Sequence, residues 1–197
     1  MPQYRKSRLS GLALAGLIAA AGISSGPTAA HSEEVYLIRG FLNVFSDGMN
    51  QMGRSLRSRG VRVSVHSNGE WPGIASNIIS RAKQGKVSYP IVIAGHSVGG
   101  VEVPDFANAL GRAGVPVKLA IGLDPGFANP GPFGPGVQTV INYRIPSGHR
   151  YRRGPGFSGS IIDVNVAAFT STDHVGIDKN RSVQSKVIAR IAAAVGK

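Results

Sequence analysis

Short apolar runs alternate with segments of helical periodicity between residues 35 and 195. Runs rich in branched apolar residues predict strands, and they cover 35–38, 61–65, 91–94, 115–123, 137–143 and 161–164. Apolar positions spaced three or four apart predict helices, which cover 47–59, 74–83, the segment after 97, and about 181–195. Strands that alternate with helices are typical of a mainly parallel sheet. The pattern therefore predicts an α/β fold with about six strands flanked by helices.

The helix after residue 97 contains a proline. Pro104 lies about two turns into this segment. Proline lacks the N–H that the helical ladder needs, and its ring crowds the preceding turn. We therefore expect the helix to kink or split at this position.

The first thirty residues have the features of a secretory signal peptide. Arg5, Lys6 and Arg8 precede an apolar stretch at 9–23, and small residues at 28–30 offer a cleavage point. This stretch is short and rich in glycine and alanine for a membrane span, although a buried helix or an uncleaved anchor is the alternative. We predict cleavage near Ala30, export to the periplasm or the medium, and no transmembrane anchor. The remainder, 31–197, suits one domain.

The chain is basic and has no cysteine. Its formal net charge is +12, and removal of the signal segment, with three basic and no acidic residues, leaves +9. This charge favours solubility or an anionic partner. The basic residues are scattered and no nucleic-acid module motif occurs, so nucleic acid is not the expected partner. The lack of cysteine excludes disulfides, a cysteine nucleophile and a thiolate metal site.

A serine flanked by glycines carries the strongest chemical signal. The sequence Gly95-His96-Ser97-Val98-Gly99 follows a predicted strand and precedes a predicted helix. At such a turn the small glycines allow a tight bend that holds a serine hydroxyl above the edge of the sheet. The bare string is common in a glycine-rich chain, so its position gives it weight. We predict that Ser97 is a nucleophile; the alternative is an ordinary glycine-rich turn.

A serine nucleophile requires a base to accept its proton. The chain has five histidines, which are His31, His66, His96, His149 and His174. His174 lies in a loop between the last strand and the last helix, where it follows Ser97 in the chain order expected of a serine–acid–histidine triad. We predict His174 as the base, with a loop histidine that caps the helix as the alternative. His96 is expected to pack or hydrogen-bond beneath the turn.

The base in turn requires an acid that fixes its tautomer. Asp124 follows the strand after the Ser97 helix. Since parallel strands end at one edge, its carboxylate should emerge beside Ser97. Asp163, on the strand at 161–164, is the rival. Asp173 and Asp178 are close to His174 in sequence and suit helix capping.

Acyl transfer also requires donors to the developing oxyanion. The backbone N–H of Val98 is one candidate. The second should come from the loop after the first strand, where Gly40 permits close approach of the backbone, and we choose the N–H of Phe41.

These motifs together resemble the small α/β-hydrolases of the esterase, lipase and thioesterase type, over about residues 35–195. The resemblance rests on Gly95–Gly99, on Leu123-Asp124-Pro125 and on the segment Asp173–Asp178. It implies a reduced α/β-hydrolase fold and hydrolysis of a small-molecule carboxylic ester or thioester. The reaction would proceed through an acyl-enzyme without a metal or cofactor. An acid directly after the strand beside the nucleophile is similar to thioesterase domains.

Two loops bear on the substrate. The Gly/Pro-rich segment 126–136 occupies the place of the helical lid of larger lipases, which predicts no lid domain and a shallow, open site. The segment after the fifth strand is basic and aromatic. It is either a solvated loop or a docking surface for anionic lipid or glycan, through Arg144, Arg150, Arg152 and Arg153.

Two other functions remain open at this point. A hydrolase scaffold can lose catalysis, since the fold alone does not fix function. The chain would then be a silent cell-envelope binding protein. The same triad would also serve an acyltransferase, in which another acceptor replaces water.

Overall fold

The computed structural model describes residues 1–2, 33–41 and 47–197. The predicted signal peptide (except Met1 and Pro2), its cleavage point near Ala30 and His31 fall outside the described residues. Within the described part, no helix is both long and apolar enough to cross a bilayer.

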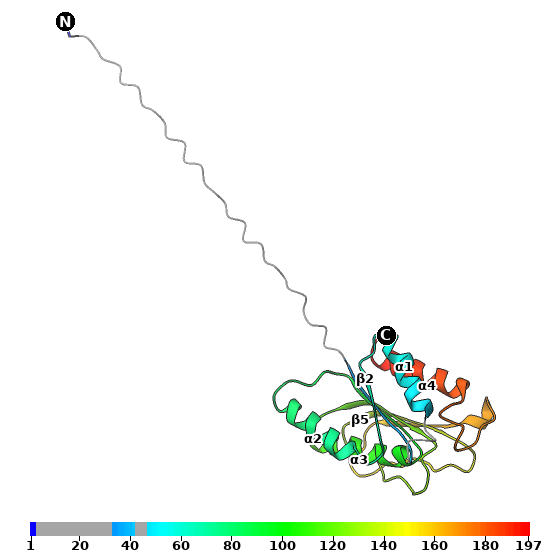
Figure 1. The fold of residues 1–197 in the computed structure, drawn as a ribbon. Helices are drawn as coiled ribbons and strands as arrows, with labels where there is room; N and C mark the ends of the chain where they lie inside the picture. Colours follow the sequence, from blue (N-terminus) through cyan, green and yellow to red (C-terminus); the bar gives the residue numbers. More distant parts are fainter. Residues whose placement is uncertain (3–32, 42–46) are drawn as a thin grey trace. The chain divides into compact units, whose positions relative to one another are not determined.

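One parallel sheet forms the centre of the fold (Figure 1). Within the described residues its strands are β1 (Glu34–Ile38), β2 (Val63–His66), β3 (Ile91–His96), β4 (Val117–Leu123), β5 (Val137–Arg144) and β6 (Ser160–Asn165). Their spatial order is β2-β1-β3-β4-β5-β6, and every neighbouring pair is parallel. All six strands therefore end at one edge, where open α/β sheets place their ligands. The predicted α/β fold with about six strands flanked by helices is confirmed.

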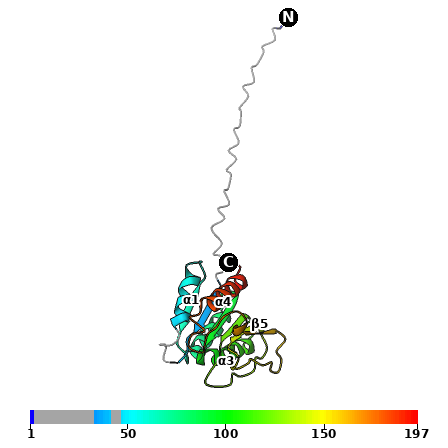
Figure 2. The same cartoon turned by 90° about the vertical axis from the view of Figure 1, so that its right-hand side faces the viewer.

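Helices cover both faces of this sheet (Figures 1 and 2). They are α1 (Asp47–Arg57), α2 (Trp71–Ala82), α3 (Val98–Arg112) and α4 (Arg181–Ala194). Helices α1 and α4 pack on one face and α2 and α3 on the other. Successive strand residues point to opposite faces, so Leu37 joins the core under α1 and α4 while Ile38 joins the core under α2 and α3. Burial of both faces explains why the central strands β1 and β3 are nearly continuous apolar runs.

Helix α3 is continuous through Pro104, so the predicted split is wrong. In an α-helix the N–H at position 104 would donate to the carbonyl of Gly100. Proline cannot supply it, and the hydroxyl of Tyr151 donates to that carbonyl instead, at 2.6 Å. The bond is buried and replaces the missing ladder bond, which allows the helix to run on. Because Tyr151 lies 51 positions from Gly100, local sequence patterns do not indicate this partner.

The basic segment is anchored to the fold, which corrects part of the docking prediction. Arg144 is only 5% exposed. Its guanidinium donates to both carboxylate oxygens of Asp163, at 2.8 to 3.0 Å, and to the carbonyl of Pro146. Arg144 is therefore a buried structural residue and cannot contact an external anion. Arg150 has a 68% exposed side chain, although it also pairs with Asp163 at 3.2 Å.

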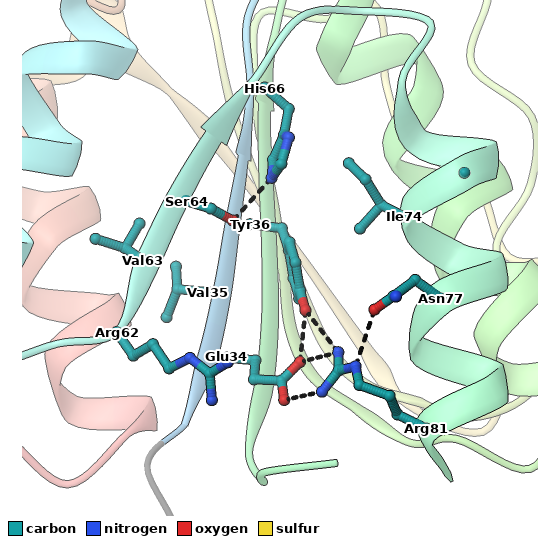
Figure 3. A pocket seen from close by; sticks show the side chains of 11 residues that line it. Glu34, Val35, Tyr36, Arg62, Val63, Ser64, His66, Ile74, Asn77 and Arg81 are labelled. Atoms are coloured by element: carbon teal, nitrogen blue, oxygen red, sulfur yellow. Dashed lines mark hydrogen bonds and ion pairs between the residues drawn. The ribbon is translucent and has the colours of Figure 1, made fainter. Parts of the chain in front are cut away.

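A groove of about 670 Å³ lies between α2 and the strands β1 and β2, of which β2 is the edge strand (Figure 3). Several of its polar side chains pair with one another (Figure 3). Arg81 donates to the two oxygens of Glu34 at 2.6 and 2.7 Å, and Ser64 lies 2.8 Å from His66. Burial disfavours the charged form of Glu34, but hydrogen bonds from Arg81, Tyr36 and the backbone outweigh it and lower the pKa of Glu34 to about 2. The ion pair joins α2 to the start of β1, at the sheet edge opposite Ser97.

Candidate active site

Ser97 occupies a strained turn between β3 and α3. Its φ is 56° and its ψ is −121°, an uncommon conformation for a residue with a side chain. A Cβ on Gly95 would collide with the carbonyl of Gly99, and a Cβ on Gly99 would lie 2.5 Å from the carbonyl oxygen of Arg39. The two motif glycines are therefore required by close backbone approach. The N–H of Ser97 donates to Leu123 at 3.1 Å, which ties the turn to the end of β4.

The structure brings Ser97, His174 and Asp124 together in one hydrogen-bonded chain. The Oγ of Ser97 lies 2.8 Å from Nε2 of His174. The Nδ1 of His174 lies 2.7 Å from Oδ2 of Asp124. A carboxylate accepts hydrogen bonds only, so the proton of a neutral His174 sits on Nδ1. Its Nε2 then presents a lone pair to the serine hydroxyl, the arrangement that a general base needs.

Asp124 is held by the ends of two strands. It is buried, and its N–H donates to the carbonyl of Tyr143 at 2.7 Å. Its Oδ1 accepts the N–H of Ile145 at 3.2 Å, which leaves Oδ2 for His174. The rival acid, Asp163, is bound to Arg144. The carboxylate that hydrogen-bonds to His174 is therefore that of Asp124.

The loop after β4 packs against the base. A Cβ on Gly126 would collide with the imidazole ring of His174. The N–H of Gly126 also donates to the carbonyl of Ser97, at 3.2 Å. Glycine at position 126 thus lets this loop contact both residues of the Ser97–His174 pair.

A hydrogen bond from His96 holds the backbone of His174, the proposed base. His96 is buried, and its Nε2 lies 2.9 Å from the carbonyl oxygen of His174. A carbonyl accepts, so His96 donates from Nε2. Burial lowers the pKa of His96, which keeps the ring neutral. The expectation that this side chain hydrogen-bonds beneath the turn agrees with the geometry.

Asp178 has a place that sequence reasoning missed. It is fully buried, with Oδ2 3.9 Å from Nδ1 of His96 and Oδ1 3.6 Å from Nζ of Lys179. Burial raises the pKa of Asp178. It does not cap α4, because Asn180 accepts the first N–H groups of that helix. Asp173 does act in a turn and accepts the N–H of Gly176 at 2.6 Å.

His66 and His149 take no part in this hydrogen-bonded chain. His66, at the end of β2, bonds to Ser64 and Glu70. His149 lines a cavity of about 230 Å³ beside His174, which is walled also by residues 124–127, 145, 147 and 148. Ser97 itself is only 3% exposed. Segment 125–136 contains no helix in the described structure, so no helical lid from that segment covers the cavity beside His174.

The predicted oxyanion donors border the serine. Val98 is the first residue of α3, directly after Ser97. The backbone of Ile38 and Arg39 packs on Gly99, which brings the loop that leads to Phe41 close to the turn. The roles of the Val98 and Phe41 N–H groups stay predictions. Within the described residues, no cluster of three or more metal-ligating side chains occurs.

No family model matches the chain, and no curated protein matches it. Several solved structures are similar at low identity. The NocB thioesterase domain from the nocardicin cluster is 14% identical, with a TM-score of 0.48, over 84% of this chain and 95% of its own. The RedJ thioesterase from the prodiginine pathway of Streptomyces coelicolor is 11% identical, with a TM-score of 0.48, over 91% of each chain. A putative hydrolase of the α/β superfamily from Xanthomonas campestris pv. campestris is 15% identical, with a TM-score of 0.44, over 82% and 99%. Similarity at this level does not identify the reaction, which has to be inferred from the site itself.

Proposed function

We propose that this protein is a serine hydrolase that cleaves carboxylic esters or thioesters. The observation that carries the proposal is the chain of hydrogen bonds from Ser97 through His174 to Asp124, at 2.8 and 2.7 Å, built on a strained strand-to-helix turn. A structural serine needs neither the strained turn nor a buried carboxylate behind its histidine. Strain of this kind is typical of functional sites.

The geometry supports a two-step reaction. In the first step, Oγ of Ser97 attacks the carbonyl carbon while its proton passes to Nε2 of His174. The N–H groups of Val98 and Phe41 stabilise the oxyanion. His174 then gives that proton to the departing alcohol or thiol, and the acyl group stays on Ser97 as an ester. In the second step, water loses a proton to His174 and attacks the acyl-enzyme. His174 then returns this proton to the departing Oγ of Ser97, which releases a carboxylic acid and restores Ser97.

Hydrolysis of p-nitrophenyl acetate by purified protein tests this proposal. We expect turnover by wild type and a loss of at least about 10³-fold in kcat for Ser97→Ala. Ser160→Ala is a matched control, because Ser160 is an exposed serine at the start of β6, outside the proposed site. An inactive wild type would favour the binding-protein alternative. Formation of a new ester with added alcohol, in place of free acid, would favour the acyltransferase.

Export and surface docking are part of the same proposal. Export is supported by the order of basic, apolar and small residues along 1–30. In protein secreted from a bacterial host, the N-terminal sequence should begin at residue 31.

Docking to anionic lipid or glycan would use Arg150, Arg152 and Arg153, since Arg144 is buried. Such binding should weaken as salt rises.

A further inference from the structure

Two exposed aromatic rings lie beside the His174 side of the proposed site. Among the phenylalanines that the structure describes, only Phe41 and Phe127 are exposed, at 54% and 80%. Their ring centres are 6.4 Å apart. The ring of Phe127 also stands edge-on to the imidazole of His174, with centres 5.9 Å apart and planes at 79°. The apolar surface that these rings offer is therefore continuous with the base.

The backbone holds Phe127 in this exposed position. Its φ is +71°, a conformation that a bulky side chain rarely adopts. The preceding residue, Gly126, is tied to Ser97 by its hydrogen bond to the serine carbonyl. Strained residues and exposed apolar side chains both concentrate where a ligand binds, and Phe127 combines the two at the proposed site.

The position of the leaving atom beside His174 determines which part of a substrate contacts these rings. His174 protonates the departing alcohol or thiol, so the departing oxygen or sulfur must lie next to the imidazole. Phe127 borders the same imidazole. A carbon chain or ring attached to the departing atom would then extend over Phe127 toward Phe41. Pro125 and Ile145 line the small cavity beside Phe127 and add apolar surface there.

We infer that Phe41 and Phe127 form a subsite for the apolar alkyl or aryl part of the leaving alcohol or thiol. The inference rests on the proposed function and deepens it. The substrate class is an ester or thioester of an apolar alcohol or thiol. The substrate's acyl group is assigned no contact with these two rings.

Two ester series that share ethyl acetate test the subsite. One varies the alcohol, with ethyl, butyl and hexyl acetate, and the other varies the acid, with ethyl acetate, butyrate and hexanoate. The alkyl alcohols have similar acidity, so their leaving ability is nearly constant. We expect kcat/KM of wild type to rise with alcohol length. In F127A the ratio of kcat/KM for hexyl acetate to that for ethyl acetate should fall about 10-fold, with a smaller fall in F41A, which keeps its backbone N–H.

Controls separate the subsite from general damage. F127L keeps an apolar side chain and should retain most of the preference for hexyl acetate. I162A removes an exposed apolar side chain on β6, away from His174, and should leave both series unchanged. A loss in F127A that is equal across the alcohol series, or that follows acyl length instead, would overturn the inference.

Labelling with a fluorophosphonate separates the two levels of failure. If wild type is neither labelled nor active on either series, the proposed function fails and the subsite fails with it. If wild type and F127A are both labelled at Ser97 and show the same alcohol preference, the subsite alone is overturned.

Discussion

The hydroxyl of Ser97 and Nε2 of His174 lie 2.8 Å apart although 77 positions separate these residues in the chain. The parallel sheet explains the encounter. Ser97 follows β3, and Asp124 follows the neighbouring strand β4, so that its carboxylate holds the ring of His174. Each side chain reaches the site from a different loop at the same edge. The chemistry therefore depends on register between strands as much as on the glycine motif.

Removal of the charge on Asp124 should slow catalysis strongly. Asp124→Asn is expected to lower kcat by about 10³ to 10⁴, because an amide can hold His174 in the wrong tautomer. Asp163→Asn is the matched control, since its carboxylate binds Arg144. Steady-state kinetics on p-nitrophenyl acetate compare the two. A large loss in Asp163→Asn beside a normal rate in Asp124→Asn would show that the acid is misassigned.

Loss of the hydrogen bond from His96 should act on kcat more than on KM. His96→Phe removes the donor to the carbonyl of His174, so the imidazole is less well fixed relative to Ser97. Small misplacements of a catalytic group are costly, and we expect kcat to fall about 10-fold or more. His96→Gln, which keeps an N–H donor, should recover part of the rate. Equal rates in the phenylalanine variant and wild type would remove His96 from any positioning role.

Tyr151 and Pro104 should show coupled effects on stability. Tyr151→Phe leaves the buried carbonyl of Gly100 without its donor and should cost about 1 to 3 kcal/mol of unfolding free energy. Pro104→Ala supplies a backbone N–H to the same carbonyl. In the double variant the cost of Tyr151→Phe should shrink, and urea unfolding of all four proteins measures this cycle. Strictly additive costs would contradict the compensation.

The ion pair between Glu34 and Arg81 should make stability depend on pH. The pKa of Glu34 is lowered to about 2 from its usual 4.5, so its charged form is favoured in the folded state. Its contribution is then complete above about pH 5 and disappears as pH falls toward 2. Glu34→Gln should cost about 3 kcal/mol at pH 7, and less at pH 3.

Unfolding of Glu34→Gln by urea at several pH values measures this dependence. Glu70→Gln is the control, because the exposed pair between Glu70 and His66 should contribute under about 1 kcal/mol. A cost for Glu34→Gln that stays constant from pH 7 to pH 3 would contradict the assignment of the effect to this carboxylate.

Local sequence patterns predict the parts of the fold that depend on neighbouring residues, which are the strands and their order along the chain. Continuous apolar runs marked the buried strands, and strand order placed Asp124 ahead of Asp163. The wrong predictions concern residues whose hydrogen-bond partners are distant in the sequence. The predicted split at Pro104 is wrong because Tyr151 replaces the missing hydrogen bond. The predicted surface role of Arg144 is wrong because Asp163 binds its guanidinium in the interior. Asp178 was missed because its burial against His96 depends on how the last loop folds back.

The proposed nucleophile can be trapped covalently. Intact protein treated with a fluorophosphonate should gain the mass of one phosphonyl group, and peptide mapping should locate that group on Ser97. His174→Ala should be labelled far more slowly, because the hydroxyl of Ser97 then lacks its base. An adduct on another serine, or none on wild type, would contradict the central claim that Ser97 is an activated nucleophile.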